Sequence, residues 1–354
     1  MPHTLETLAR AIVSAHAQLA LQPGAERRLD ALFATAAQST DMATQPPSSP
    51  PQRLAVVGQA SARPDQPESP LTDTEPWTAA TNQAVLAAAQ ALDFWPVDAQ
   101  CIAQAWQHQT ERCGQFDALA WPTEPQDFGL PAMPHAQAFA PCPQQLGLYA
   151  VLPDAQWVGR MARAGVPTLQ LRFKSDDPAA VALEVRAAVQ AVQGTPALLF
   201  INDHWQAAIE AGAYGVHLGQ EDLQALSVAD LSAIRAAGLR LGVSSHGYAE
   251  MLRAAAVQPS YIALGAVYAT NLKRMATPPQ GPQRLKSYAQ VLRHFPTVAI
   301  GGIDLNCLDA VLASGVGSFA VVRALIGAKQ PEEMAQTLMS KLPVDLIKQA
   351  QIAI

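Results

Sequence analysis

The stretch FINDHWQAAIEAGAYGVHLGQED, residues 200–222, decides the fold. It holds two short apolar runs, each followed closely by an aspartate, with a segment of small residues at helical spacing between them. A strand, a helix and a second strand at this spacing predict parallel strands joined by a crossover helix. Ligands of such proteins bind at the carboxyl ends of the strands. We therefore expect Asp203 and Asp222 to lie together at a binding site.

The same pattern repeats along the second half of the chain. About eight apolar runs, with Ala-rich helical segments between them, lie at residues 147–152, 168–173, 197–202, 215–219, 240–245, 261–267, 297–302 and 318–323. This number of repeats in about 200 residues predicts a closed (β/α)8 TIM barrel. An open doubly wound sheet is the alternative, but it would normally show a G-x-G-x-x-G turn near its first strand, and the sequence has none there.

The first third of the chain has a different composition. Proline-rich stretches at residues 41–77 and 121–143 predict linkers, because proline disfavours regular structure around it. We expect helices over residues 81–91 and 98–109, the second with Asp98 as its N-cap, and a short strand at 54–57. The predicted organisation is a mainly helical region at 1–140, the barrel at 146–342 and a tail at 343–354.

Charge and cysteine content limit the classes of function. The chain has 23 Lys and Arg against 29 Asp and Glu, a net charge of −6, which argues against a broad nucleic-acid surface. Its four cysteines form no C-x-x-C pair and no metal-ligand spacing with the histidines, as expected in a reducing compartment. No secretory signal or membrane-spanning run is visible. We expect a cytoplasmic protein that binds small molecules, and leave a homo-oligomer open.

Polar residues follow most of the apolar runs. At the shared mouth of a barrel we expect Gln170, Arg172, Lys174, Asn202, Asp203, Gln220, Asp222, Ser244, Ser245, His246, Thr270, Lys273, Arg274, Gly301, Gly302 and Arg323. Cations beside a Gly-Gly turn bind phosphate through charge and backbone N–H groups. Two carboxylates supply oxygen ligands for Mg²⁺, which is usually held together with substrate phosphates. The set predicts a diphosphate and metal site, suited to displacement at carbon or to phosphoryl transfer.

An ordered set of motifs resembles the thiamine phosphate synthase family. The motifs are LYAVLPD (148–154), QLRFK (170–174), IND (201–203), GVHLGQED (215–222), GVSSH (242–246), YATNLK (268–273), PPQG (278–281) and AIGGI (299–303). Each motif is weak alone, but their order is specific, and the resemblance covers about residues 146–342. It implies a transferase of thiamine biosynthesis that condenses 4-amino-5-hydroxymethyl-2-methylpyrimidine diphosphate with a thiazole phosphate, plain or carboxylated, and releases diphosphate.

The resemblance also implies roles for individual residues. Asp203 and Asp222 would hold Mg²⁺ at the diphosphate of the pyrimidine substrate. Binding residues for the two substrates would be Gln170, Lys174, Asn202, Ser244 and Lys273 for the pyrimidine diphosphate, and Thr270, Gly302 and the backbone around Val322 for the thiazole phosphate. From their place at the mouth we also expect Arg172 and Arg323 to bind substrate. Lys174, Lys273 and Ser244 would assist a dissociative reaction, in which diphosphate leaves before the thiazole nitrogen attacks. Such chemistry needs preorganised charge more than a catalytic base.

Two positions depart from the family pattern. The family motif P-T-x-T-K is replaced by Ala269 to Lys273, which lacks the proline and the second hydroxyl group. Losing a hydroxyl–phosphate hydrogen bond costs about 1–3 kcal/mol, so we predict weaker binding rather than no activity. Arg323 stands where the family usually has serine, and we predict that it grips the thiazole phosphate, with obstruction of the pocket as the alternative.

Structural roles compete with these assignments. Asp203 alone would fit the N-cap of the next helix, and Lys174 and Lys273 alone would fit solvated loop residues. His246 fits a structural residue better than a general base, and we expect His217 to serve packing or to support its neighbours. The ordered motifs and the second carboxylate favour the metal-site interpretation.

Two other functions share this barrel and stay open. One is a thiazole tautomerase using His246, which would have no use for two carboxylates. The other is a thiamine-pathway sensor that binds phosphate without turnover. Residues 87–106 resemble, faintly, the helical end of a hydroxymethylpyrimidine kinase. Because residues 1–140 hold no glycine-rich phosphate loop, we predict that this region has no kinase activity.

Overall fold

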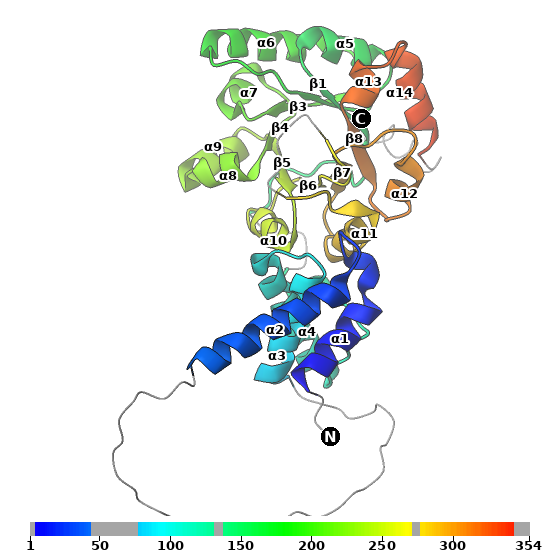
Figure 1. Cartoon of the computed structure of the whole chain (residues 1–354). Coiled ribbons are helices and arrows are strands. Elements are labelled where there is room, and N and C mark those ends of the chain that lie inside the picture. Colours follow the sequence, from blue (N-terminus) through cyan, green and yellow to red (C-terminus); the bar gives the residue numbers. More distant parts are fainter. Residues whose placement is uncertain (1–3, 44–76, 131–136, 271–276, 343–354) are drawn as a thin grey trace, which may run out of the picture. The chain divides into compact units, whose positions relative to one another are not determined.

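The computed structural model describes residues 4–43, 77–130, 137–270 and 277–342. Eight parallel strands close into a barrel in sequence order (Figure 1). The strands are β1 Gly147–Leu152, β2 Thr168–Leu171, β3 Leu198–Asn202, β4 Gly215–Leu218, β5 Arg240–Ser245, β6 Tyr261–Leu264, β7 Thr297–Ile300 and β8 Ser318–Val321. The predicted (β/α)8 barrel is confirmed, and the open sheet is excluded because β1 pairs with β8.

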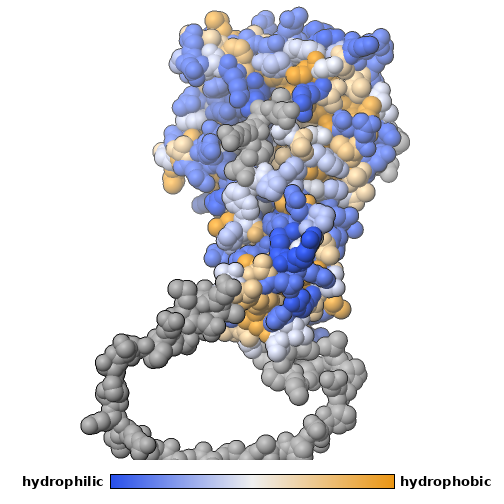
Figure 2. Space-filling view, viewed as in Figure 1, coloured by the Kyte–Doolittle hydropathy of each residue, from blue (hydrophilic) through white to orange (hydrophobic). Residues whose placement is uncertain are grey.

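Helices lie outside the strands and connect them (Figure 1). They are α5 Ala155–Arg163, α6 Pro178–Ala191, α7 Trp205–Ala211, α8 Gln220–Ala225, α9 Val228–Ala236, α10 Tyr248–Ala256, α11 Gly281–Val291, α12 Leu308–Leu312, α13 Arg323–Ile326 and α14 Pro331–Ser340. Each buries an apolar face, as α5 does with Val158 and Met161. The visible outer face of the barrel is mostly hydrophilic, with scattered hydrophobic residues (Figure 2).

Aromatic side chains fill the interior of the barrel. Tyr149 and Val151 are two residues apart on β1, so their side chains lie on the same side of the strand. They belong to a buried cluster with Phe200 and Tyr261. The ring of Tyr149 meets those of Phe200 and Tyr261 edge to face. Gly242 makes room for this packing, because a Cβ atom there would lie 2.1 Å from the Tyr261 ring. Because these side chains fill the interior, the space for a ligand begins beyond them, at the end of the barrel.

The N-terminal region is helical. Its elements are α1 Leu5–Ala15, η1 Ala17–Leu19, α2 Ala25–Ala43, α3 Ala79–Ala91, α4 Pro96–Cys113 and η2 Pro125–Phe128. The chain forms two compact units, one of residues 1–95 and 106–121 and one of residues 96–105 and 122–354. In the first unit the fully buried Trp106 contacts Trp121 and Phe116. Residues 96–105 therefore group with the barrel.

The structure corrects one local prediction and leaves others untested. The helix expected at 81–91 is present, but the one expected at 98–109 begins at Pro96, with Trp95 as its N-cap. Proline suits the first helical position because it lacks an N–H group, so the prediction of Asp98 as N-cap was wrong. The strand expected at 54–57 and the tail at 343–354 lie outside the described residues. Of the helices that are described, none is long and apolar enough to cross a membrane.

Candidate active site

A cavity of about 570 Å³ opens at the carboxyl ends of the strands. This volume is in the range of small-molecule sites. Residues predicted from the sequence line it: Gln170, Arg172, Asn202, Asp203, Asp222, Ser244, Thr270, Gly302, Val322 and Arg323. Gln170, Asn202 and Ser244 lie near the ends of β2, β3 and β5, and the others follow β2, β3, β4, β6, β7 and β8, whose ends the closed barrel brings together.

Two predicted lysines do not join this set. Lys174 is exposed on the loop after β2 and does not line the cavity. Lys273 lies outside the described residues. Both roles therefore stay predictions.

A chain of hydrogen bonds runs along one wall of the cavity. Gln170 is buried in β2, and its Nε2 donates to Asn202 Oδ1 at 2.7 Å. Asn202 Nδ2 in turn donates to Asp203 Oδ2 at 2.5 Å. Among the described residues, Gln170 Oε1 has no hydrogen-bond partner although it is buried. A buried acceptor without a partner is costly, so this oxygen is a natural site for an N–H donor of a ligand.

Asp203 and Asp222 form the predicted acidic pair. The Asp203 N–H donates to the His217 carbonyl at 3.0 Å, which ties the end of β3 to β4, and Asp222 lies in the first turn of the helix after β4. Asp203 has a left-handed backbone, with φ of 64°. Aspartate adopts this conformation more readily than most residues do. A left-handed backbone in a residue other than glycine often occurs at functional sites. The N-cap of α7 is His204, so the interpretation of Asp203 as that cap is wrong.

The environment of the pair disfavours ionisation of both carboxyl groups at once. Desolvation, the charge of Asp222 and a hydrogen bond to its carboxyl group raise the pKa of Asp203 to about 6, although His204 and Arg172 oppose the change. Two adjacent carboxylates cannot both ionise easily unless a cation joins them. Asp222 Oδ2 also accepts from the Gly219 N–H at 3.2 Å, which holds this carboxylate in place. The donor set of two carboxylates suits Mg²⁺.

The pair alone does not make a closed metal cage. No group of three or more His, Cys, Asp or Glu side chains suited to a metal occurs within the described ranges. Mg²⁺ typically takes one or two carboxylates and fills its other positions with water and substrate phosphates. The arrangement therefore fits a cation that is bound together with a phosphorylated substrate.

Ser244 is held by a buried chain of three further side chains. Its Oγ lies 2.8 Å from His217 Nε2, His217 Nδ1 lies 2.7 Å from the Tyr261 hydroxyl, and that hydroxyl lies 2.6 Å from the Tyr149 hydroxyl. Burial lowers the pKa of His217 to about 4, so its ring is neutral at pH 7. A neutral imidazole donates from one nitrogen and accepts at the other. The chain therefore fixes the orientation of the Ser244 hydroxyl.

The predicted Gly-Gly turn follows β7. Gly301 and Gly302 have φ values of 102° and 65°, which favour glycine. The turn is also crowded, since a Cβ at Gly302 would lie 2.6 Å from the Ala269 carbonyl oxygen. The Tyr268 N–H donates to the Gly301 carbonyl at 2.9 Å, so the loop after β6 packs on the turn. Such turns present backbone N–H groups to anions.

Cations and a second histidine complete the lining. Arg172 and Arg323 both line the cavity, and Arg172 is close enough to Asp203 to affect its pKa. His246 also lines the cavity, and Glu250 Oε2 lies 2.6 Å from its Nδ1 and accepts from its backbone N–H at 2.9 Å. Desolvation raises the pKa of Glu250, but the hydrogen bonds and charge of His246 outweigh this, and the pKa is lower than that of a free glutamate. The mouth thus combines acidic and basic groups.

Sequence reasoning missed part of the site. His217 supports Ser244 by a direct contact, in line with the expectation of packing or support, but its place in the lining of the cavity was not expected. Its place in β4 gives the signal, since side chains alternate along a strand and His217 shares the inward side with Gly215. Asp304, which also lines the cavity, lies past the last family motif and had no such signal.

Comparisons with known proteins find relatives of the barrel part of the chain. The family model described as thiamine monophosphate synthase matches residues 148–325. A thiamine-phosphate synthase of Neisseria gonorrhoeae is 52% identical over 202 residues, which are 57% of this chain and 97% of that protein. One from Escherichia coli O1:K1 is 54% identical over 190 residues, 54% of this chain and 89% of that protein. A solved thiamine phosphate pyrophosphorylase of Pyrococcus furiosus has a TM-score of 0.48 and 24% identity, over 58% of this chain and 96% of that one.

Proposed function

The chain belongs to the thiamine monophosphate synthase family, and we propose that its cavity joins a pyrimidine diphosphate to a thiazole phosphate. Family membership makes it a thiamine phosphate synthase, a transferase of thiamine biosynthesis. The relatives described above are named as synthases, and none is named as a tautomerase or a sensor. One observation carries the assignment of the site: an acidic pair and a Gly-Gly turn lie in a single cavity.

The acidic side of the cavity fits the pyrimidine diphosphate. Asp203 and Asp222 would hold Mg²⁺ against the diphosphate, and the bound cation would neutralise charge on the departing group. Gln170 Oε1, which has no partner in the described part of the chain, would accept from the amino group of the pyrimidine. Asn202 bridges Gln170 and Asp203, so the two ends of this substrate would be held at a fixed spacing.

The opposite side fits the thiazole phosphate. Backbone N–H groups at Gly301 and Gly302 would bind the phosphate oxygens, and Thr270 and Arg323 would add a hydroxyl and a charge. Arg323 is exposed at the rim rather than packed across the cavity, which supports the gripping role over obstruction. Val322 would pack against this substrate.

The reaction needs no proton transfer from the protein to the reacting carbon. The bond between the pyrimidine methylene carbon and the diphosphate oxygen breaks, and its electron pair leaves with diphosphate. The thiazole nitrogen then supplies the pair for the new carbon–nitrogen bond. The neutral His217–Ser244 pair is positioned before the reaction starts, so it would stabilise the developing charge without reorganisation, and Arg172 in the same cavity would add a positive charge.

Diphosphate release by the purified chain tests this proposal. We expect release to need both substrates and Mg²⁺, and Asp203→Asn to lower kcat by about 100-fold or more, as loss of a preorganised group does elsewhere. Asp309→Asn changes an exposed carboxylate that does not line the cavity, and should stay near the wild-type rate. Release from the pyrimidine diphosphate alone, or full activity of Asp203→Asn, would contradict the assignment.

A further inference from the structure

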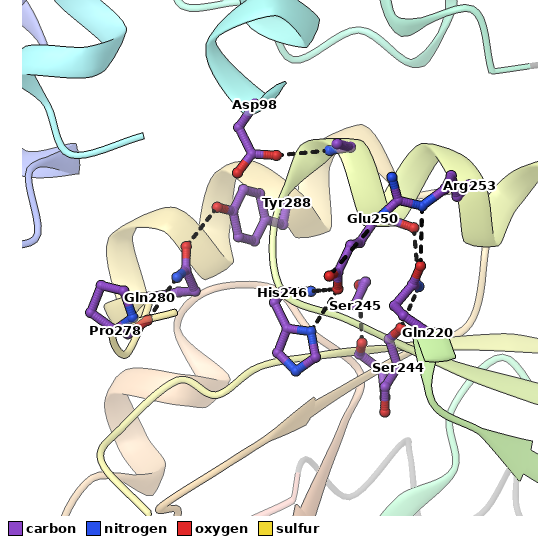
Figure 3. Close-up of polar contacts among 12 residues, drawn as sticks. Asp98, Gln220, Ser244, Ser245, His246, Glu250, Arg253, Pro278, Gln280 and Tyr288 are labelled. Carbon is purple, nitrogen blue, oxygen red and sulfur yellow. Dashed lines mark hydrogen bonds and ion pairs between the residues drawn. The ribbon is translucent and has the colours of Figure 1, made fainter. Parts of the chain in front are cut away.

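An aspartate outside the family match caps the helix that follows β5, the strand whose end lines the cavity. Asp98 is the third residue of α4 and belongs to the part of that helix that groups with the barrel. Its Oδ1 accepts from the Ala249 backbone N–H at 2.8 Å (Figure 3). We propose that Asp98 is a positioning residue for the synthase, which holds the first turn of α10 and, through it, His246 and the end of β5.

Helix α10 has no cap of its own. Its N-cap residue is Gly247, which offers no side chain to the N–H groups of the first turn. These groups need an acceptor, and a carboxylate suits them because it also opposes the positive end of the helix dipole. Asp98 supplies it from a distant part of the chain. Desolvation raises the pKa of Asp98 while the Ala249 N–H opposes the change, as expected for a half-buried capping group.

Gly247 is matched to this contact. Its φ of −179° is extended backbone that any residue adopts, so its conformation does not require glycine. A Cβ at this position would lie 2.5 Å from Asp98 Oδ2, so any other residue here would displace the Asp98 carboxylate. The helix therefore lacks a capping side chain at the one place where the Asp98 carboxylate needs room.

The capped turn is connected to the cavity at two points. Glu250, next to Ala249, holds both the backbone N–H and the ring of His246 (Figure 3). One turn later, Arg253 Nε donates to Gln220 Oε1 at 3.3 Å, and Gln220 Nε2 donates to the Ser244 carbonyl at 2.7 Å. A shift of α10 would therefore move His246 directly and Ser244 through Gln220.

Other residues before the family match hold the same helix. Phe128 stacks on Tyr248, with ring centroids 5.1 Å apart and an interplanar angle of 8°. Beyond the carboxyl end of the helix, the Phe139 N–H donates to the Gln258 carbonyl at 2.9 Å. Both ends of α10 are thus fixed by segments that precede residue 148, where the family match begins. These segments complete the support of the site.

A double-mutant cycle on the full-length chain tests the role of Asp98. Asp98→Ala removes the cap, and Gly247→Ser crowds the carboxylate, so each should lower kcat/KM for the pyrimidine diphosphate about tenfold. Together they should recover to within about threefold of wild type, because the introduced serine becomes a local cap where the carboxylate has gone. Asp98→Asn keeps Oδ1 as an acceptor and should also stay within about threefold.

Controls separate this role from general stability and from the proposed activity. Ser227→Ala removes the cap of α9, whose residues do not line the cavity, and should lower Tm without changing kcat/KM. Amide hydrogen exchange at Ala249 needs no activity, and should be faster in Asp98→Ala than in wild type. An inactive wild-type protein would therefore refute the proposed function, while hydrogen exchange at Ala249 would still test whether Asp98 caps α10.

Three results would overturn the proposal. The first is wild-type kcat/KM in a folded Asp98→Ala protein. The second is a double variant whose loss equals the product of the two single losses. The third concerns the case in which Asp98→Ala does not fold. The double variant should then restore both folding and kcat/KM. A double variant that fails to restore either one would show that Asp98 does not act through the cap.

Discussion

Metal binding by the acidic pair should depend on pH in a way that ordinary aspartates would not show. In the metal-free protein the pKa of Asp203 is about 6, raised from 3.8 by desolvation and by Asp222. Below pH 6 the pair therefore holds a proton that an incoming cation must displace. We expect the affinity of the metal-free, substrate-free protein for Mg²⁺, or for Mn²⁺ as a spectroscopic probe, to fall as the pH falls from 7 to 5.

The magnitude follows from the ionised fraction of Asp203. With a pKa of about 6, roughly nine-tenths of the Asp203 carboxyl groups are ionised at pH 7 and roughly one-tenth at pH 5, so the apparent affinity should fall about tenfold. With the ordinary pKa of 3.8, more than roughly nine-tenths would be ionised at both values, and the affinity would hardly change.

Paramagnetic titration of Mn²⁺ at a series of pH values measures this dependence directly. Asp203→Asn should bind more weakly and lose the tenfold dependence, whereas Asp309→Asn, at an exposed carboxylate outside the cavity, should keep both the affinity and the dependence. An affinity of the wild type that is constant between pH 5 and 7 would refute the argument, because it would show that the two carboxylates do not share a proton.

Further predictions concern the interior, the glycine turn and the rim. Tyr261→Phe leaves His217 Nδ1 without its partner and should cost about 1–3 kcal/mol in the free energy of unfolding; chemical denaturation should show a smaller loss for Tyr149→Phe, and equal losses would count against the chain. Gly302→Ala, at φ of 65°, should raise KM for the thiazole phosphate about tenfold or more while KM for the pyrimidine diphosphate stays within about twofold; the reverse pattern in steady-state kinetics would exchange the two sides of the cavity. Arg323→Ser should raise KM for the thiazole phosphate by about 10- to 100-fold. Lys329→Ser changes a cation outside the cavity lining and should leave this KM unchanged. An unchanged KM in Arg323→Ser would show that Arg323 does not contact the phosphate.

The barrel was predictable because its signal is periodic and repeated. Strands β1 and β5 begin and end where the apolar runs do, whereas β2 and β6 end before their apolar runs do. After β6 the run continues into a loop in which Ala266 and Val267 are buried, and Ala266 lines the cavity. Apolar character reports burial, so it overestimates a strand wherever the following loop is also buried.

The site was predictable where residue type and position agree. Carboxylates, amides and glycines at strand ends carried enough information to place the acidic pair and the Gly-Gly turn. The contacts of Asp98 and His217 depend on residues far away in the sequence, at Ala249 and Tyr261. Local patterns suggested a cap for Asp98 and packing for His217, because capping and packing are the commonest local roles of such residues.

The structure of the chain with Mg²⁺, thiamine phosphate and diphosphate would test the central claim most directly. The account predicts diphosphate and the cation between Asp203 and Asp222, and the phosphate of the thiazole half at Gly302 beside Arg323. A thiazole phosphate bound at the acidic pair, or a diphosphate at the glycine turn, would contradict the division of the cavity on which the proposed mechanism depends.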